Sequence, residues 1–132
     1  MNIAILGFGT VGTGVYKIIK RANRQTKNLS VKYILIRKNK PATKPEMTDD
    51  LNQILDDPDL DVVVEVMGGI EPAHQYIISA LKHGKYVITA NIAVIAKYMD
   101  EFTTVAAENG VKFYFESSVG GGIPWIQGLD RA

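Results

Sequence analysis

The sequence predicts an α/β fold: a doubly wound, mainly parallel sheet with helices on both faces. Three observations support this prediction. Short apolar runs that suit buried strands alternate with segments whose apolar residues recur at helical spacing. The first apolar run ends in a glycine-rich turn that opens a helical segment. The chain has 132 residues, 46% of them hydrophobic, which is enough for one domain with a substantial core.

The first half of the chain predicts two strands and two helices. Residues 2–6 (NIAIL) suit a strand that is buried on both faces. A helix is expected from Val11, because apolar residues then recur at helical spacing. Residues 31–36 (VKYILI) predict the second strand. After a polar, proline-containing loop, Thr48 is expected to cap a short second helix.

The second half predicts three more strands and two more helices. The apolar runs that predict strands are residues 61–67 (DVVVEVM), 86–89 (YVIT) and 111–115 (VKFYF). One helix is expected to begin near Pro72 and end at Gly84. Another is expected over about residues 94–108. Because helices connect successive strands, the strands should be parallel.

The turn after the first strand carries the sharpest functional signal. Gly7-Phe8-Gly9-Thr10-Val11-Gly12 fits the pattern G-x-G-x-x-G between a buried strand and a helix. Gly7 would permit the tight turn, Gly9 would leave room for a pyrophosphate, and Gly12 would let the helix pack on the strand. The start of the helix would offer N–H groups to the phosphates. The motif predicts a Rossmann-type dinucleotide site formed by these six residues, and a glycine-rich turn without a ligand is the alternative.

The end of the second strand bears on the choice of cofactor. An acidic residue there would bind the ribose 2′-hydroxyl of NAD. This sequence has Arg37 and Lys38 instead, and their side chains could hold a 2′-phosphate. The pair therefore favours NADP over NAD. The alternative is that both are solvated loop cations.

Two further strand ends fall on the edge of the sheet where ligands bind in such folds. Met67, Gly68 and Gly69 lie at the end of the third strand, and Thr89 and Asn91 lie at the end of the fourth. Small residues there would let a cofactor approach the backbone. We therefore include these five residues in the predicted cofactor site, with ordinary turn chemistry as the alternative.

Acidic residues elsewhere are open to more than one interpretation. Glu65 lies within a buried strand, where a functional group and a hydrogen-bonded structural carboxylate are equally plausible. Four aspartates surround Pro58: Asp56, Asp57, Asp59 and Asp61. This cluster is more typical of a solvated turn than of a metal site.

Four segments in order resemble homoserine dehydrogenase. They are residues 7–12 (GFGTVG), 61–69 (DVVVEVMGG), 84–91 (GKYVITAN) and 115–124 (FESSVGGGIP). The resemblance covers essentially the whole chain. It implies an oxidoreductase that interconverts L-homoserine and L-aspartate 4-semialdehyde with NAD(P)(H), on the route to threonine and methionine.

One position departs from the family pattern Thr-Ala-Asn-Lys. Ile92 stands where the family has a lysine close to the nicotinamide and the substrate. Isoleucine cannot carry a proton or donate a side-chain hydrogen bond. The other catalytic groups of the family, an aspartate and a lysine, belong to a domain outside this chain. We therefore assign no catalytic residue here and expect the chain alone to be inactive.

The family resemblance also implies a monovalent cation, usually sodium, bound by backbone carbonyls. Carried over, the ligands would be the carbonyl oxygens of Glu116, Val119, Gly121 and Ile123. Oxygen ligands suit a hard cation. The alternative interpretation of this glycine-rich segment is a hinge between domains without a metal.

The expected organisation is a dinucleotide-binding domain over residues 1–116, followed by residues 117–132 as a hinge and the start of a further domain. In the family that domain supplies the substrate pocket and the homodimer contact. The rival hypothesis is a non-catalytic Rossmann module that binds or senses NAD(P)(H). Ile92 and the short chain favour the rival, whereas the four ordered segments favour the dehydrogenase.

Composition narrows the classes of partner. The formal net charge is +1, which gives no electrostatic reason to expect nucleic acid or an anionic membrane. The sequence contains no cysteine, which excludes disulfides and cysteine metal sites and fits a reducing compartment. The apolar runs are too short to span a bilayer. We expect a cytoplasmic protein that acts on a small molecule.

Overall fold

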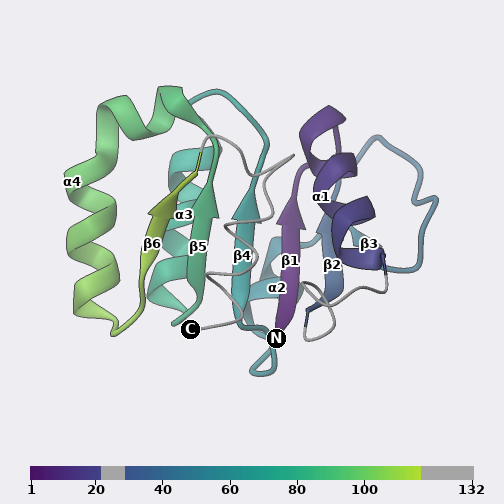
Figure 1. Ribbon diagram of the computed structural model, residues 1–132, viewed down its shortest axis with the longest axis horizontal. Helices are drawn as coiled ribbons and strands as arrows, with labels where there is room; N and C mark the ends of the chain where they lie inside the picture. Colours follow the sequence, from purple (N-terminus) through teal and green to yellow (C-terminus); the bar gives the residue numbers. More distant parts are fainter. Residues whose placement is uncertain (22–28, 117–132) are drawn as a thin grey trace.

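The computed structural model describes residues 1–21 and 29–116, which form a parallel sheet covered by helices (Figure 1). The strands are β1 (Asn2–Leu6), β2 (Ser30–Leu35), β3 (Met47–Thr48), β4 (Val62–Glu65), β5 (Tyr86–Thr89) and β6 (Phe113–Phe115). The helices are α1 (Thr10–Lys20), α2 (Leu51–Leu55), α3 (Ala73–Lys82) and α4 (Ile92–Glu108). Every strand pair is parallel, in the order β3-β2-β1-β4-β5-β6. The predicted doubly wound α/β fold is confirmed.

Different helices cover the two faces of the sheet, as the opposite placement of α1 and α3 in Figure 1 illustrates. Along β1, Ile3 and Ile5 point into the core beneath α1, whereas Ala4 and Leu6 point into the core beneath α2, α3 and α4. All four residues are fully buried. Within residues 1–21 and 29–116, no helix is long and apolar enough to cross a membrane.

The path of the chain changes direction at the centre of the sheet. From β1 the chain passes through α1 to β2 and β3 on one side, then crosses to β4, β5 and β6 on the other. The connections that leave β1 and β4 therefore run to opposite faces. A crevice at the carboxyl ends of such neighbouring strands is where α/β folds bind ligands.

Several predicted boundaries were wrong by a few residues. Thr48 does not cap α2 but lies in β3, a two-residue strand that the sequence did not predict. Asp50 is the cap, because its Oδ1 accepts from the N–H groups of Asn52 (3.0 Å) and Gln53 (3.3 Å). Helix α4 begins at Ile92, two residues earlier than expected. Strands β4 and β6 are shorter than predicted.

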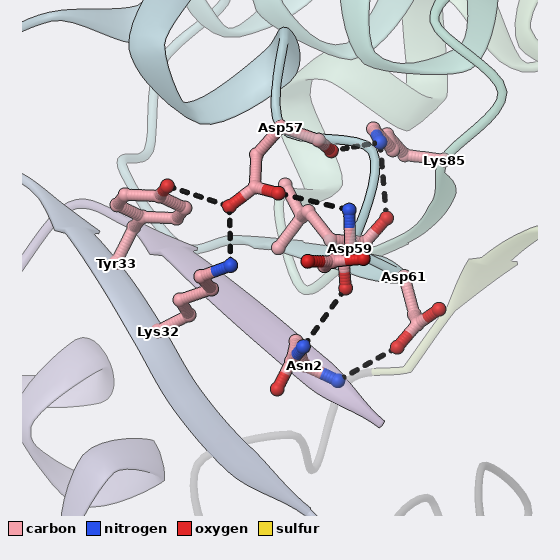
Figure 2. Close-up of polar contacts among 8 residues, drawn as sticks. Asn2, Lys32, Tyr33, Asp57, Asp59, Asp61 and Lys85 are labelled. Carbon is pink, nitrogen blue, oxygen red and sulfur yellow. Dashed lines mark hydrogen bonds and ion pairs between the residues drawn. The ribbon is translucent and has the colours of Figure 1, made fainter.

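The turn between α2 and β4 is more ordered than the predicted solvated turn (Figure 2). The side chain of Asp57 is only 10% exposed. Its Oδ2 accepts from Lys32 Nζ and Tyr33 Oη, each at 2.6 Å, and its Oδ1 accepts from the Asp59 N–H at 2.8 Å. The hydrogen bonds from Lys32 and Tyr33 hold the pKa of the Asp57 carboxyl well below its usual range. The solvated-turn interpretation is therefore wrong for Asp57.

Other polar side chains lie near this turn, at the amino-terminal edge of the sheet (Figure 2). Lys85 is 6% exposed, and its Nζ donates to the carbonyl oxygens of Asp57 (2.6 Å) and Leu60 (3.0 Å). The backbone N–H of Asn2 donates to Asp61 Oδ2 at 2.8 Å. These contacts join the starts of β1, β4 and β5 through polar side chains.

Candidate functional site

The three glycines of the turn after β1 have different surroundings. Gly7 has φ +101°, a conformation that L side chains rarely adopt. A Cβ on Gly12 would lie 2.4 Å from the carbonyl oxygen of Gly7, so this glycine allows α1 to pack against the turn. A Cβ on Gly9 would meet no protein atom within 4 Å. Gly9 is therefore not required by packing within the described residues, and the space beside it is open to a ligand.

The first turn of α1 faces the same space. Gly9 is its N-cap, no side chain caps the helix, and its first turn has no acidic residue. The leading N–H groups of a helix have no partner within the helix, and they carry a partial positive charge. Thr10 and Val11 are exposed, whereas Phe8 packs edge-on against Tyr16 with ring centroids 5.7 Å apart. This end of the helix can accept an anion.

The end of β2 lies beside the glycine turn, because the Gly7 N–H donates to the Leu35 carbonyl at 3.1 Å. Arg37 and Lys38 follow two and three residues later, and both are exposed. A turn begins there, with the Lys40 N–H donating to the Arg37 carbonyl at 3.1 Å. Both predicted cations therefore lie at the carboxyl edge of the sheet, on the side of β1 opposite to β4.

The loops after β4 and β5 lie on the other side of the glycine turn and contact each other. Gly68 and Gly69 have φ values of +78° and +74°, and both are exposed. Asn91 Nδ2 donates to the Gly69 carbonyl at 2.5 Å, and Asn91 Oδ1 caps α4 by accepting from the Val94 N–H at 3.2 Å. A Cβ on Gly7 would lie 3.1 Å from Met67 Cγ, so Met67 borders the glycine turn. The predicted site residues of three strand ends thus meet along one edge.

Sequence reasoning left the role of Glu65 open, and its contacts now define it. The side chain is fully buried, and both carboxylate oxygens accept hydrogen bonds, from Thr89 Oγ1 at 2.5 Å and from the Met67 N–H at 2.8 Å. The sequence placed Glu65 in a buried strand but did not show which groups would bind its carboxylate. The signal in the sequence was the placement of Glu65 and Thr89 at the ends of what prove to be adjacent strands.

Two predicted features lie at the margins of the site. Ile92 is the first residue of α4 and is 68% exposed, so an apolar side chain stands at this edge. The Glu116 N–H donates to the Thr89 carbonyl at 2.9 Å, which continues the ladder between β5 and β6. The other predicted cation ligands, Val119, Gly121 and Ile123, lie outside the described residues. In residues 1–21 and 29–116, no three acidic or histidine side chains gather to hold a metal ion.

The family is decided by comparison with known proteins. The model of the homoserine dehydrogenase NAD-binding domain matches residues 7–116, which is most of the chain. The chain belongs to the homoserine dehydrogenase family. The family resemblance predicted from the four sequence segments is confirmed, and the chain corresponds to the NAD-binding domain. A free-standing sensing module is not favoured.

Relatives in this family include the homoserine dehydrogenase of Bacillus subtilis (39% identical, over 99% of this chain and 33% of that protein). The homoserine dehydrogenase of Synechocystis is 41% identical over 100% of this chain and 32% of that protein. The chain therefore spans about a third of the length of these relatives.

Solved structures agree with the same assignment. A Staphylococcus aureus homoserine dehydrogenase matches with a TM-score of 0.78 and 42% identity, over 89% of this chain and 32% of that chain. A hyperthermophilic archaeal homoserine dehydrogenase in complex with NADPH matches with a TM-score of 0.72 and 27% identity, over 89% of this chain and 44% of that chain.

Proposed function

We propose that the chain binds the dinucleotide along the carboxyl edge of the sheet, with the pyrophosphate at Gly9 and the first turn of α1. The observation that carries the proposal is the open space at Gly9 beside a helix start that no side chain caps. Phosphate oxygens at that position would accept from the leading N–H groups of α1. Phe8, Thr10 and Val11 would line the same turn.

We propose that the two halves of the cofactor lie on opposite sides of this turn, and the strand order supports this. The adenosine ribose belongs at the end of β2 in such folds. The nicotinamide half would then lie over the ends of β4 and β5, against Met67, Gly68 and Gly69, with the buried Thr89 and Asn91 beneath them. When bound, the nicotinamide ring donates or accepts the hydride, and these loops would hold the ring in place.

We further propose that the chain prefers NADP to NAD. Arg37 and Lys38 are exposed at the end of β2, where either could pair with a 2′-phosphate. The archaeal relative whose structure contains NADPH supports this choice. A charge-assisted hydrogen bond to phosphate contributes about 1.5–3 kcal/mol, or roughly ten- to hundredfold in affinity.

Calorimetry with NADPH and NADH tests both proposals. The wild-type chain should bind NADPH more tightly, and Arg37→Ala should reduce that preference. Lys40→Ala is the matched control, since Lys40 is another exposed cation of the same loop. Equal affinity of the wild type for NADH and NADPH would exclude the 2′-phosphate role of Arg37. No measurable binding of either would overturn the proposed function.

We propose that this chain is the cofactor domain of a longer protein that interconverts L-homoserine and L-aspartate 4-semialdehyde. Hydride transfer requires the substrate carbon to be aligned over the nicotinamide, and the chain contains the cofactor side of that arrangement. Fusions of the chain to a family catalytic domain, with Ile92 and with Ile92→Lys, would test this. We expect turnover in the fusions but not in the chain alone, with a higher rate for Ile92→Lys, because a positioned proton carrier typically contributes about 10²–10⁴-fold. Equal rates would show that Ile92 is tolerated.

We also propose a monovalent cation near the carbonyl of Glu116, shared with Val119, Gly121 and Ile123. The support is the family resemblance of the glycine-rich segment, and a metal-free hinge is the alternative. In the fusion protein, sodium should raise the thermal midpoint more than choline at equal ionic strength. Identical midpoints in the two salts would favour the hinge.

We propose that the longer protein is a cytoplasmic homodimer that acts on a small-molecule substrate, without a nucleic-acid or membrane partner. Sedimentation of the fusion tests the dimer, and cell fractionation of the longer protein tests the location. A monomeric fusion would contradict the dimer, and recovery outside the cytoplasmic fraction would contradict the location.

A further inference from the structure

A chain of hydrogen bonds joins the loops after β4 and β5 through one buried carboxylate. Glu65 Oε2 accepts from the Met67 N–H (2.8 Å), and Glu65 Oε1 accepts from Thr89 Oγ1 (2.5 Å). Thr89 Oγ1 in turn accepts from the Asn91 N–H (3.0 Å). Asn91 Nδ2 donates back to the Gly69 carbonyl (2.5 Å), which closes the circuit. The two loops are therefore held as one unit.

The side chains of this circuit are buried. Glu65 and Thr89 are fully buried, and Asn91 is 7% exposed. A buried polar group that loses its partner pays the full cost of desolvation, so water does not substitute for the missing bond. Gly68 and Gly69, in contrast, are exposed and have no side chains to fix them. Their position is set by the contacts at Met67 and Gly69.

We infer that Glu65 is a positioning residue for the nicotinamide half of the cofactor, acting through Met67 and Thr89. The inference rests on the proposed function, which lays that half over the ends of β4 and β5. Glu65 itself is fully buried beneath the loops and takes no part in contacting the ligand. Its hydrogen bonds fix the position of the loop backbone against which the nicotinamide half lies.

Glu65→Gln is a sharp test because it keeps the size of the side chain and removes one acceptor. The carboxylate serves two donors, the Met67 N–H and the Thr89 hydroxyl. A glutamine offers one oxygen and one NH₂ group. In either orientation of the amide, one of those two donors loses its acceptor. The loop after β4 or the hydroxyl of Thr89 must then shift.

The readout separates positioning from general stability. Affinities for NADPH and for 2′,5′-ADP, which contains only the adenosine half, are measured on the 132-residue chain. Glu65→Gln should weaken NADPH binding about tenfold, because the displaced loop backbone no longer fits the nicotinamide half, and leave 2′,5′-ADP binding within about twofold. The amide resonance of Met67 should shift.

Two further variants sharpen the test. Lys85→Met removes a buried charge at the opposite edge of the sheet, so it should lower stability and leave both affinities unchanged (Figure 2). Thr89→Val breaks the same circuit at its next member and should also weaken NADPH binding. Both changes break the same set of hydrogen bonds. The double variant Glu65→Gln/Thr89→Val should therefore bind NADPH about as tightly as the single variant with the lower affinity.

The outcomes are distinct. Unchanged NADPH affinity in Glu65→Gln would overturn the assignment, and so would equal losses of NADPH and 2′,5′-ADP binding, because these would indicate a role in the fold alone. Fully additive losses in the double variant would show that Glu65 does not act through Thr89. Failure of the wild-type chain to bind NADPH would instead overturn the proposed function, and this inference with it.

Discussion

The two edges of the parallel sheet use polar side chains in opposite ways. At the amino-terminal edge, the Asp57 carboxylate accepts from Lys32 and Tyr33, and Lys85 donates to the carbonyls of Asp57 and Leu60, so polar side chains there bind other parts of the protein (Figure 2). At the carboxyl edge, Glu65 and Asn91 bind loop backbone from beneath, and the exposed surface above them is formed by glycines. Hydrogen bonds of polar side chains join segments of the protein at one edge, and at the other edge they support loops whose surface is exposed.

This difference separates stability from binding. A change at the amino-terminal edge should act on the free energy of unfolding and leave nucleotide affinity unchanged. A change at the carboxyl edge should act on affinity, except where a glycine also serves packing. Gly9 and Gly12 lie three residues apart. Gly12 is required by packing, whereas Gly9 is not. Substitutions at the two edges should therefore have distinct effects on stability and on nucleotide affinity.

Gly12→Ala should have the largest effect. Its Cβ would lie 2.4 Å from the Gly7 carbonyl oxygen, so the turn or α1 must move. We expect a loss of about 1–3 kcal/mol in the free energy of unfolding, as for other overpacked sites, together with loss of NADPH binding. Urea denaturation and calorimetry measure the two effects. Wild-type stability in this variant would show that the close packing of α1 on the turn is not required.

Gly9→Ala should separate binding from stability within the same turn. Its Cβ meets no protein atom within 4 Å, and φ is −84°, so the fold can accept it. Alanine is a poorer N-cap than glycine, which costs at most about 1 kcal/mol. NADPH affinity should fall roughly tenfold or more, because the methyl group occupies the place of a phosphate contact. Unimpaired binding would remove Gly9 from the proposed site.

Lys85→Met should show the reverse pattern. The substitution removes the side-chain donor of the Leu60 carbonyl in a buried position, and it removes one donor of the Asp57 carbonyl, which keeps the Leu60 N–H at 3.2 Å. We expect a loss of about 1–3 kcal/mol in the free energy of unfolding, with unchanged NADPH affinity in the same preparation. Weakened binding at this distance would show that the two edges are not independent.

Asp57→Asn should change how stability depends on pH. The Asp57 pKa is lowered in the folded state from its ordinary value of 3.8 by the hydrogen bonds from Lys32 and Tyr33. The folded state therefore binds the proton less readily, and the stabilisation is present above about pH 4 and lost as the pH falls below it. Denaturation midpoints of wild type and Asp57→Asn should differ at neutral pH and converge in acid. A constant difference would contradict the lowered pKa.

Most of the fold could be predicted because long patterns determine it. The glycine turn and the alternation of strands with helices extend over many residues, and the sheet that they predict is the parallel sheet of the structure. Strand β3 was missed because Met47 and Thr48 are two residues, too few for any periodicity. Their strand exists because its neighbour β2 supplies partners, as in the Ile36 N–H donating to the Thr48 carbonyl at 2.9 Å.

The candidate site was predictable in its backbone elements and less so in its side-chain contacts. The glycine motif and the strand ends identified the loops, because each is local in sequence. The bond between Asn91 and Gly69 spans 22 residues, and that between Glu65 and Thr89 spans 24. Likewise, the ring of His74 stacks on Tyr98 of α4 with centroids 3.7 Å apart. Such partners depend on strand order and helix placement, which the sequence pattern left undetermined in detail.

The location of the cofactor site is tested most directly by a map of backbone amide resonances of the 132-residue chain titrated with NADPH. We expect shifts at Gly9, Thr10 and Val11, at Arg37 and Lys38, and at Gly68, Gly69 and Asn91. We expect no shifts at the residues of the amino-terminal edge, which are Asn2, Asp59, Asp61 and Lys85. Shifts confined to the amino-terminal edge, or an unchanged spectrum at saturating NADPH, would contradict the assignment of the cofactor site to the carboxyl edge.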